Sequence, residues 1–94
     1  MAPDVIQNQE LERYELVIDG DLAGYSEYRV HGVEIVFTHT EIITDSREHG
    51  LGGRLVREAL DRVREHTDYR VVAQCPFVAQ WISGHPEYQD LLTR

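Results

Sequence analysis

Residues 45–56 read Asp45-Ser46-Arg47-Glu48-His49-Gly50-Leu51-Gly52-Gly53-Arg54-Leu55-Val56, and the patterns on either side of them indicate how the chain folds. An apolar run over residues 33–43 precedes the stretch, and an amphipathic helical pattern that ends near His66 follows it. The glycines therefore stand where a strand leads into the first turn of a helix. The N–H groups of such a turn lack intrahelical partners and carry the positive end of the helix dipole, and glycine lets a ligand approach them closely. The turn is a candidate phosphate site, and the alternative is a turn that needs glycine only for its φ angles.

The helix after the glycines is predicted over residues 51–66. Its apolar residues recur at three- and four-residue spacing and form one stripe, namely Leu51, Leu55, Val56, Ala59, Leu60 and Val63. A strand pattern over residues 69–75 comes next and stops at Pro76. A strand, a helix and a second strand suggest a right-handed crossover, which makes residues 33–43 and 69–75 parallel neighbours.

Two further strands are predicted before the apolar run, over residues 13–19 and 22–30. Asp19-Gly20-Asp21 and His31-Gly32 are the turns, so the three strands form an antiparallel meander. After Pro76, residues 77–82 and 87–92 are expected to be short helical segments. The fold class is therefore α/β (α+β), a sandwich on one mixed sheet in the order β-β-β-α-β-α. We expect a single domain over residues 13–94 and a flexible leader over residues 1–12.

Composition limits the classes of function. The chain has 94 residues and a net charge of −8, which disfavours nucleic acids and anionic membranes as partners. Its single cysteine excludes an intrachain disulfide framework, and its five histidines show no metal-ligand spacing. Neither a signal peptide nor an apolar run long enough for a membrane span is recognisable, so a cytoplasmic location is expected.

Four motifs together resemble the GNAT superfamily of N-acetyltransferases. Arg47-Glu48-His49-Gly50-Leu51-Gly52 fits the R/Q-x-x-G-x-G/A signature, and His39-Thr40-Glu41-Ile42 looks like the H-T-E-V strand of its short, single-domain YjdJ-type members. Cys75-Pro76-Phe77-Val78 and His85-Pro86-Glu87-Tyr88-x-Asp90-Leu91 are similar to the closing motifs of that subgroup. The resemblance covers residues 14–92. One departure is Glu48, which stands where many members have a glycine.

The resemblance implies a binding site for acetyl-coenzyme A. The pyrophosphate of coenzyme A would lie on the backbone of the signature turn, with two arginines adding charge; these residues are Arg47, His49, Gly50, Leu51, Gly52, Gly53 and Arg54. The pantetheine arm would pair with the backbone of Thr40 and Ile42 where the two parallel strands separate. The thioester would then lie near the carboxyl ends of residues 39–42 and 72–75.

Four side chains are candidates for the chemistry, each with an alternative. Cys75 can accept the acetyl group as a thiolate, line the pantetheine slot, or be buried and inert. His39 can be the general base, because imidazole changes its charge near neutral pH, or a structural histidine. Glu41 is a rival base or an ion-pair partner of an arginine, and a bulge near it would change the face on which it lies. Tyr88 can protonate the leaving thiolate or close the core.

The sequence thus predicts an enzyme that moves an acetyl group from acetyl-coenzyme A to an amine, without a metal. The alternative is a non-catalytic module that binds coenzyme A or a protein partner on the same fold. The expected acceptor is an amine on a small molecule or a protein. The expected oligomeric state is a monomer or a weak homodimer.

Overall fold

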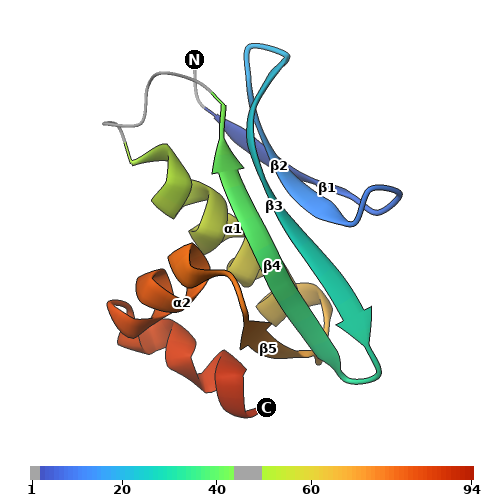
Figure 1. The fold of residues 1–94 in the computed structure, drawn as a ribbon, viewed down its shortest axis with the longest axis vertical. Helices are drawn as coiled ribbons and strands as arrows, with labels where there is room; N and C mark the ends of the chain where they lie inside the picture. Colours follow the sequence, from blue (N-terminus) through green and yellow to red (C-terminus); the bar gives the residue numbers. More distant parts are fainter. Residues whose placement is uncertain (1–2, 44–49) are drawn as a thin grey trace.

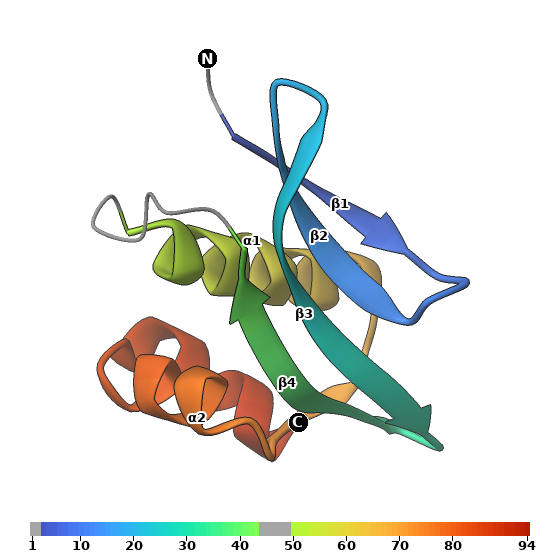
Figure 2. The same ribbon diagram turned by 45° about the horizontal axis from the view of Figure 1, so that its top comes forward.

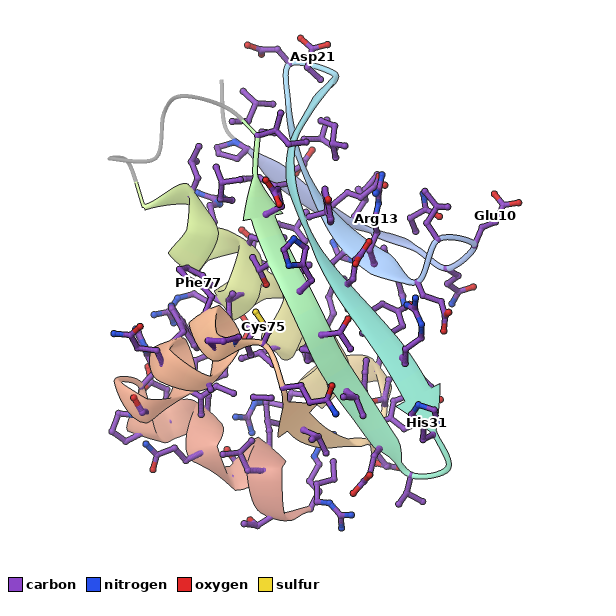
Figure 3. The ribbon with its side chains drawn as sticks, in the orientation of Figure 1. Glu10, Arg13, Asp21, His31, Cys75 and Phe77 are labelled. Atoms are coloured by element: carbon purple, nitrogen blue, oxygen red, sulfur yellow. The ribbon has the colours of Figure 1, made fainter. Side chains whose placement is uncertain are left out.

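Five strands form one mixed sheet in the computed structural model, which describes residues 3–43 and 50–94 (Figure 1). Their order across the sheet is β1-β2-β3-β4-β5, and only β4 and β5 are parallel. The elements are β1 (Asp4–Asn8), β2 (Arg13–Ile18), β3 (Asp21–His31), β4 (Glu34–Ile42), α1 (Leu51–His66), β5 (Arg70–Ala73), α2 (Pro76–Ser83) and the 3-10 helix η2 (Pro86–Thr93). The predicted meander, crossover and α/β sandwich are confirmed. In Figure 3, Asp21 and His31 mark the two turns of the meander at opposite ends of the molecule.

The expected leader over residues 1–12 is wrong in one respect, because β1 is an additional strand on the edge of the sheet. It pairs antiparallel with β2, with Val5 opposite Leu16, and the Arg62 guanidinium donates a hydrogen bond to the carbonyl of Val5. Val5 is buried, whereas its neighbour Ile6 is half exposed. One inward-facing apolar residue gives no alternating pattern in the sequence, and therefore the strand is defined by its partner and not by its own composition.

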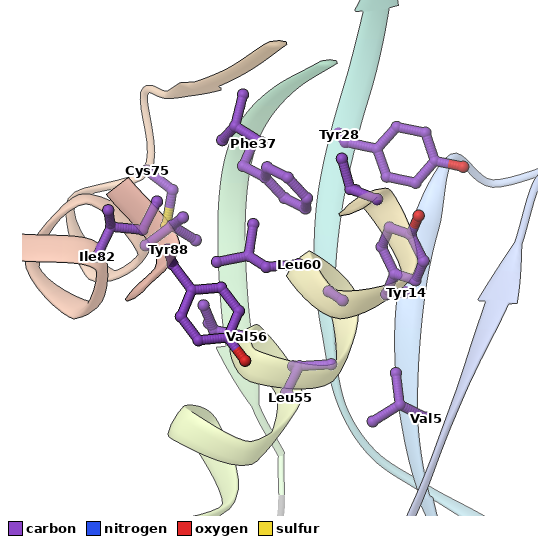
Figure 4. Packing of buried hydrophobic residues seen from close by; sticks show 14 of the residues in the cluster. Val5, Tyr14, Tyr28, Phe37, Leu55, Val56, Leu60, Cys75, Ile82 and Tyr88 are labelled. Carbon is purple, nitrogen blue, oxygen red and sulfur yellow. The ribbon is translucent and has the colours of Figure 1, made fainter. Parts of the chain in front are cut away.

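The helices lie against one face of the sheet, and the core fills the space between them (Figure 2). The whole predicted stripe of α1 is buried, and it packs against inward-facing side chains of the strands such as Leu16, Tyr28 and Phe37. α2 adds Val78 and Ile82 to the same cluster, as Figure 4 shows in part. The opposite face of the sheet carries polar side chains. No helix among the described residues is both long and apolar enough to cross a membrane.

The pairing of β4 with β5 ends half-way along β4. It runs from Glu34 opposite Arg70 to Phe37 opposite Ala73, and the amide of Cys75 adds one last hydrogen bond of 2.9 Å to the carbonyl of Phe37. β4 continues to Ile42 beside β3 alone. The chain turns away after Ala73 because Pro76 begins α2. The two central parallel strands therefore separate at their carboxyl ends.

Candidate active site

The open edge of β4 over residues 38–41 is the centre of the site. The amide of Ile43 donates to the carbonyl of Ala23 at 2.8 Å, and Gly24 lies opposite Ile42. This geometry makes that pair, and by alternation the pair of Ser26 and Thr40, non-hydrogen-bonded pairs of the antiparallel ladder. The backbone N–H and C=O of Thr40 therefore point away from β3, toward the side that β5 has left. Thr40 is one of the two residues for which pairing with pantetheine was predicted, and Ile42 is the other.

The side chain of Thr40 connects β3, β4 and the start of α2. Its hydroxyl lies 3.0 Å from the hydroxyl of Ser26 and accepts a weak hydrogen bond from the Cys75 thiol at 3.5 Å. Ser26 and Cys75 are both buried. Figure 3 shows Cys75 between β4 and the start of α2, at the point where the strands separate. The structure thus brings Cys75 and Thr40 together, and it adds Ser26, which the sequence had not identified. The only feature that could have identified Ser26 is its position opposite Thr40 in the β3–β4 register.

His39 and Glu41 lie on the other face of the sheet. The irregularity in the β3–β4 register falls next to Thr38, between the pairs of Glu27 with His39 and Tyr28 with Phe37. Because the bulge precedes His39, the two side chains still share a face, and His39 Nε2 lies 2.9 Å from Glu41 Oε1. Both side chains are about half exposed, at 52% and 49%. They form a solvent-accessible dyad beside the ring of Tyr25, whose centroid is 6.2 Å from that of His39.

The amino terminus of α1 fits an anionic group. Gly50 precedes the helix in the left-handed conformation, with φ of 70°. Within residues 3–43 and 50–94 no side chain caps the helix, and its first turn holds no acidic residue. The first helical hydrogen bond runs from the amide of Arg54 to the carbonyl of Gly50, so the amides of Leu51, Gly52 and Gly53 have no intrahelical partner. The predicted ligands Arg47 and His49 lie outside the described residues, as does Glu48.

Gly52 and Gly53 also have a packing role that the sequence analysis missed. A Cβ atom on Gly52 would meet the Phe77 ring at 2.8 Å, and one on Gly53 would meet Trp81 Nε1 at 3.3 Å. Both aromatic residues belong to α2, so the two glycines let α2 approach the first turn of α1 closely. Figure 3 shows Phe77 beside that turn. The spacing of Phe77 and Trp81, four residues apart on one helix face, was the available signal.

Arg54 and Glu34, two charged residues on the elements of the site, are engaged in ion pairs. The Arg54 guanidinium binds Glu58 at 2.7 Å on the surface of α1. Glu34, a further carboxylate on the strand of His39, pairs with Arg70 at the opposite end of β4. Among the described residues, no group of three His, Cys, Asp or Glu side chains could hold a metal ion.

The hydroxyl of Tyr88 faces α1 instead of the open edge of β4. It donates to Asp61 at 2.7 Å and accepts from Arg57 at 3.3 Å. Burial, followed by the hydrogen bond to Asp61, raises the pKa of Tyr88 above its usual value. Because a proton held in this way is harder to release, the geometry does not favour Tyr88 as the acid, and its catalytic role stays a prediction.

Comparison with known proteins agrees with this arrangement. A family model described as GCN5-related N-acetyl-transferase matches residues 13–91, which include every strand but β1, both α-helices and most of η2. No curated protein matches the chain.

Proposed function

This chain belongs to the GCN5-related N-acetyltransferase family, and we propose that it moves an acetyl group from acetyl-coenzyme A to an amine. The observation that carries the proposal is the open edge of β4. There the backbone of Thr40 faces the gap left by β5, within reach of the Cys75 thiol and on the chain segment that leads to the uncapped start of α1. An extended ligand arm can add to such an edge as a further strand would.

The residues present fit coenzyme A. The amides of Leu51, Gly52 and Gly53 would hold the pyrophosphate, with Gly50 supplying the left-handed turn and Arg47, His49 and Arg54 supplying further contacts. Thr40 and Ile42 would hold the pantetheine arm through their backbones. When bound, acetyl-coenzyme A supplies a thioester carbonyl that an amine can attack. A backbone N–H at the open edge would polarise that carbonyl.

We assign the proton transfer to the dyad of His39 and Glu41. An amine is mostly an ammonium ion at neutral pH and must lose a proton before it attacks. His39 Nε2 lies within hydrogen-bond distance of Glu41, so the carboxylate can orient the ring and stabilise it once it is protonated. Glu41 can also take the proton itself. Both side chains face solvent on the outer face of the sheet, so the acceptor would approach from that side.

Cys75 would act on the thioester from the inner face of the sheet. As a thiolate it could attack the thioester carbonyl, form a thioester with Cys75 Sγ and release the coenzyme A thiolate, before the amine takes the acetyl group. As a thiol it would only line the slot. Tyr88 remains a candidate donor to the leaving thiolate only if its hydrogen bond to Asp61 breaks.

The first test is a titration of the protein with coenzyme A and acetyl-coenzyme A, followed through backbone amide resonances. We expect saturable shifts at residues 40–43, at residues 50–53 and at Cys75. An absence of shifts at millimolar ligand would refute the binding site. The second test is the release of free coenzyme A in the presence of a panel of primary amines.

Three variants separate the roles in that second test. His39→Gln should reduce turnover by about 10²- to 10⁴-fold, the usual contribution of a general base. Cys75→Ser should abolish turnover if the cysteine is acetylated, and should change it little if it only lines the slot. His31→Gln, at the exposed β3–β4 turn, is the matched control and should turn over like the parent.

The second candidate function is a non-catalytic module that binds coenzyme A or a protein. Two observations favour it: Gly52 and Gly53 are explained by the packing of α2, and Arg54 is occupied by Glu58. Binding of coenzyme A without turnover of any amine would support this function. We further propose membership of the short YjdJ-type subgroup, a cytoplasmic location, a single domain that includes β1 as well as residues 13–94, and a monomer or weak homodimer.

A further inference from the structure

A second cavity lies at the other end of α1, away from the proposed coenzyme A slot. Its volume is about 280 Å³. Tyr14, Tyr28 and Ile35 are buried and form its floor, while Tyr69, His66 and Gln7 stand around its mouth. It shares no residue with the open edge of β4 or the glycine turn. An apolar cavity of about 150 Å³ already holds benzene, so this one has room for a substituted ring.

The hydroxyl of Tyr14 is the feature that points to a ligand. Tyr14 is only 2% exposed and lines the cavity, yet its hydroxyl makes no hydrogen bond to any of the described residues. The hydroxyl of Tyr28, by contrast, accepts from Gln7 at 2.8 Å. Figure 4 shows the Tyr14 hydroxyl directed toward Tyr28. No side-chain oxygen or nitrogen of the described residues is both fully enclosed and unpartnered, so the Tyr14 hydroxyl is reached from the cavity, and a molecule in the cavity can supply its partner.

The chemistry of the walls restricts what that partner can be. Burial, followed by the neighbouring Tyr28, raises the pKa of Tyr14 to about 12, so the hydroxyl is protonated and can donate. Among the described residues that line the cavity there is no carboxylate and no guanidinium, and His66 at its mouth is the one basic group. The nearby Arg62 is engaged with the carbonyl of Val5. Burial of a charged ligand would therefore be unfavourable, whereas the tyrosine rings and Ile35 favour an aromatic one.

We propose that this cavity is a second ligand site, which takes a small, uncharged aromatic molecule whose carbonyl oxygen accepts a hydrogen bond from Tyr14. The site lies at the carboxyl end of α1, and the glycine turn lies at its amino end. Binding at this site does not require that the protein transfers an acetyl group. It is defined by the residues of its floor and mouth named above.

Benzamide is the test ligand, because it has an aromatic ring, a carbonyl acceptor and no charge. It is titrated into the full chain to about 20 mM while backbone amide resonances are followed. We expect saturable shifts at Tyr28, His66 and Tyr69, with residues 40–43 and 50–53 unchanged. Benzoate, which has the same shape with a negative charge, should give no saturable shift at these positions. Shifts that do not saturate, or equal binding of benzoate, would overturn the proposal.

Two variants test the role of the hydroxyl. Tyr14→Phe removes only the unpartnered oxygen and should weaken benzamide binding by about two- to tenfold, as expected for one hydrogen bond. Tyr25→Phe makes the same change on the outer face of the sheet and should leave the affinity unaltered. Val30→Trp places a large ring at the mouth of the cavity, on a half-exposed position that tolerates it, and should abolish binding. Equal affinity of the parent and Tyr14→Phe would refute the assignment, and so would unchanged binding by Val30→Trp.

Discussion

Alanine at position 52 provides a sharp test of why the chain has glycine there. In an isolated helix, Gly→Ala stabilises by about 1 kcal/mol, because alanine has the higher helix propensity. In this protein the new Cβ would lie 2.8 Å from the Phe77 ring, closer than non-bonded carbons approach, so the ring must move. The sign of the change therefore depends on what the displaced ring loses.

The structure gives the size of that loss. Phe77 is 43% exposed, so somewhat over half of its surface is covered, which is on the order of 110 Å² for a side chain of about 200 Å². At about 25 cal/mol per Å², exposure of half to all of this area costs about 1.5–3 kcal/mol. After subtraction of the propensity gain, Gly52→Ala should lower the free energy of unfolding by about 0.5–2 kcal/mol.

A double-mutant cycle with Phe77→Ala separates the two terms. Without the ring, Gly52→Ala should become stabilising by about 1 kcal/mol, so the coupling between the two positions is about 1.5–3 kcal/mol. Urea unfolding of the four proteins, followed by circular dichroism, measures both values. Gly53→Ala is the matched control, because its Cβ would meet Trp81 at a looser 3.3 Å. A Gly52→Ala variant that is stabilised equally in both backgrounds would show that the close contact with Phe77 does not exist.

Three further predictions concern other parts of the fold. The pKa of Tyr14 is about 12 in the folded state, whereas an unfolded tyrosine ionises near pH 10, so the free energy of unfolding should fall by about 2–3 kcal/mol between pH 10 and 12. The Tyr14→Phe variant should show a smaller fall over this range. An equal fall in both proteins would contradict the prediction. Ser26→Ala removes the hydroxyl that binds Thr40 and should lower the free energy of unfolding by about 1 kcal/mol in urea, with Ser83→Ala as an exposed control. Deletion of residues 1–8 should lower the melting temperature by several degrees, because it uncovers Leu16 and removes the hydrogen bond that Arg62 donates to Val5. An unchanged melting temperature would show that these residues are a leader that does not stabilise the fold.

Much of the fold was accessible from the sequence because its elements carry their own periodic patterns. The stripe from Leu51 to Val63 predicts α1 with both of its ends, since a helix of this length buries one face whatever it packs against. The turns at Gly20 and Gly32 likewise gave the meander. β1 was not predicted because Val5 is its one buried apolar residue and gives no periodic pattern. The strand is held by its pairing with β2, which its own sequence does not report.

The site was accessible only in part, for a related reason. Strand alternation placed Thr40 and Ile42 together and His39 with Glu41, and the strand register agrees with both pairings. The environment of Tyr88 depends on Asp61, 27 residues away, and no local pattern reports such a contact. The contact of Gly52 with Phe77 also joins two helices that the sequence describes separately. Local patterns therefore predicted which backbone would be open, but not which side chains would already have partners.

The separation of β4 from β5 also bears on how this chain behaves in a crowded solution. An unpaired strand edge is a template on which another chain can form β-structure, and folded proteins commonly protect such edges with charge and short length. Here the open edge runs only over residues 38–41 and carries the polar side chains of His39 and Glu41. A ligand that pairs with this edge would hide the same N–H and C=O groups from a second molecule. Saturation with coenzyme A should therefore delay aggregation on heating by more than its effect on the melting temperature alone.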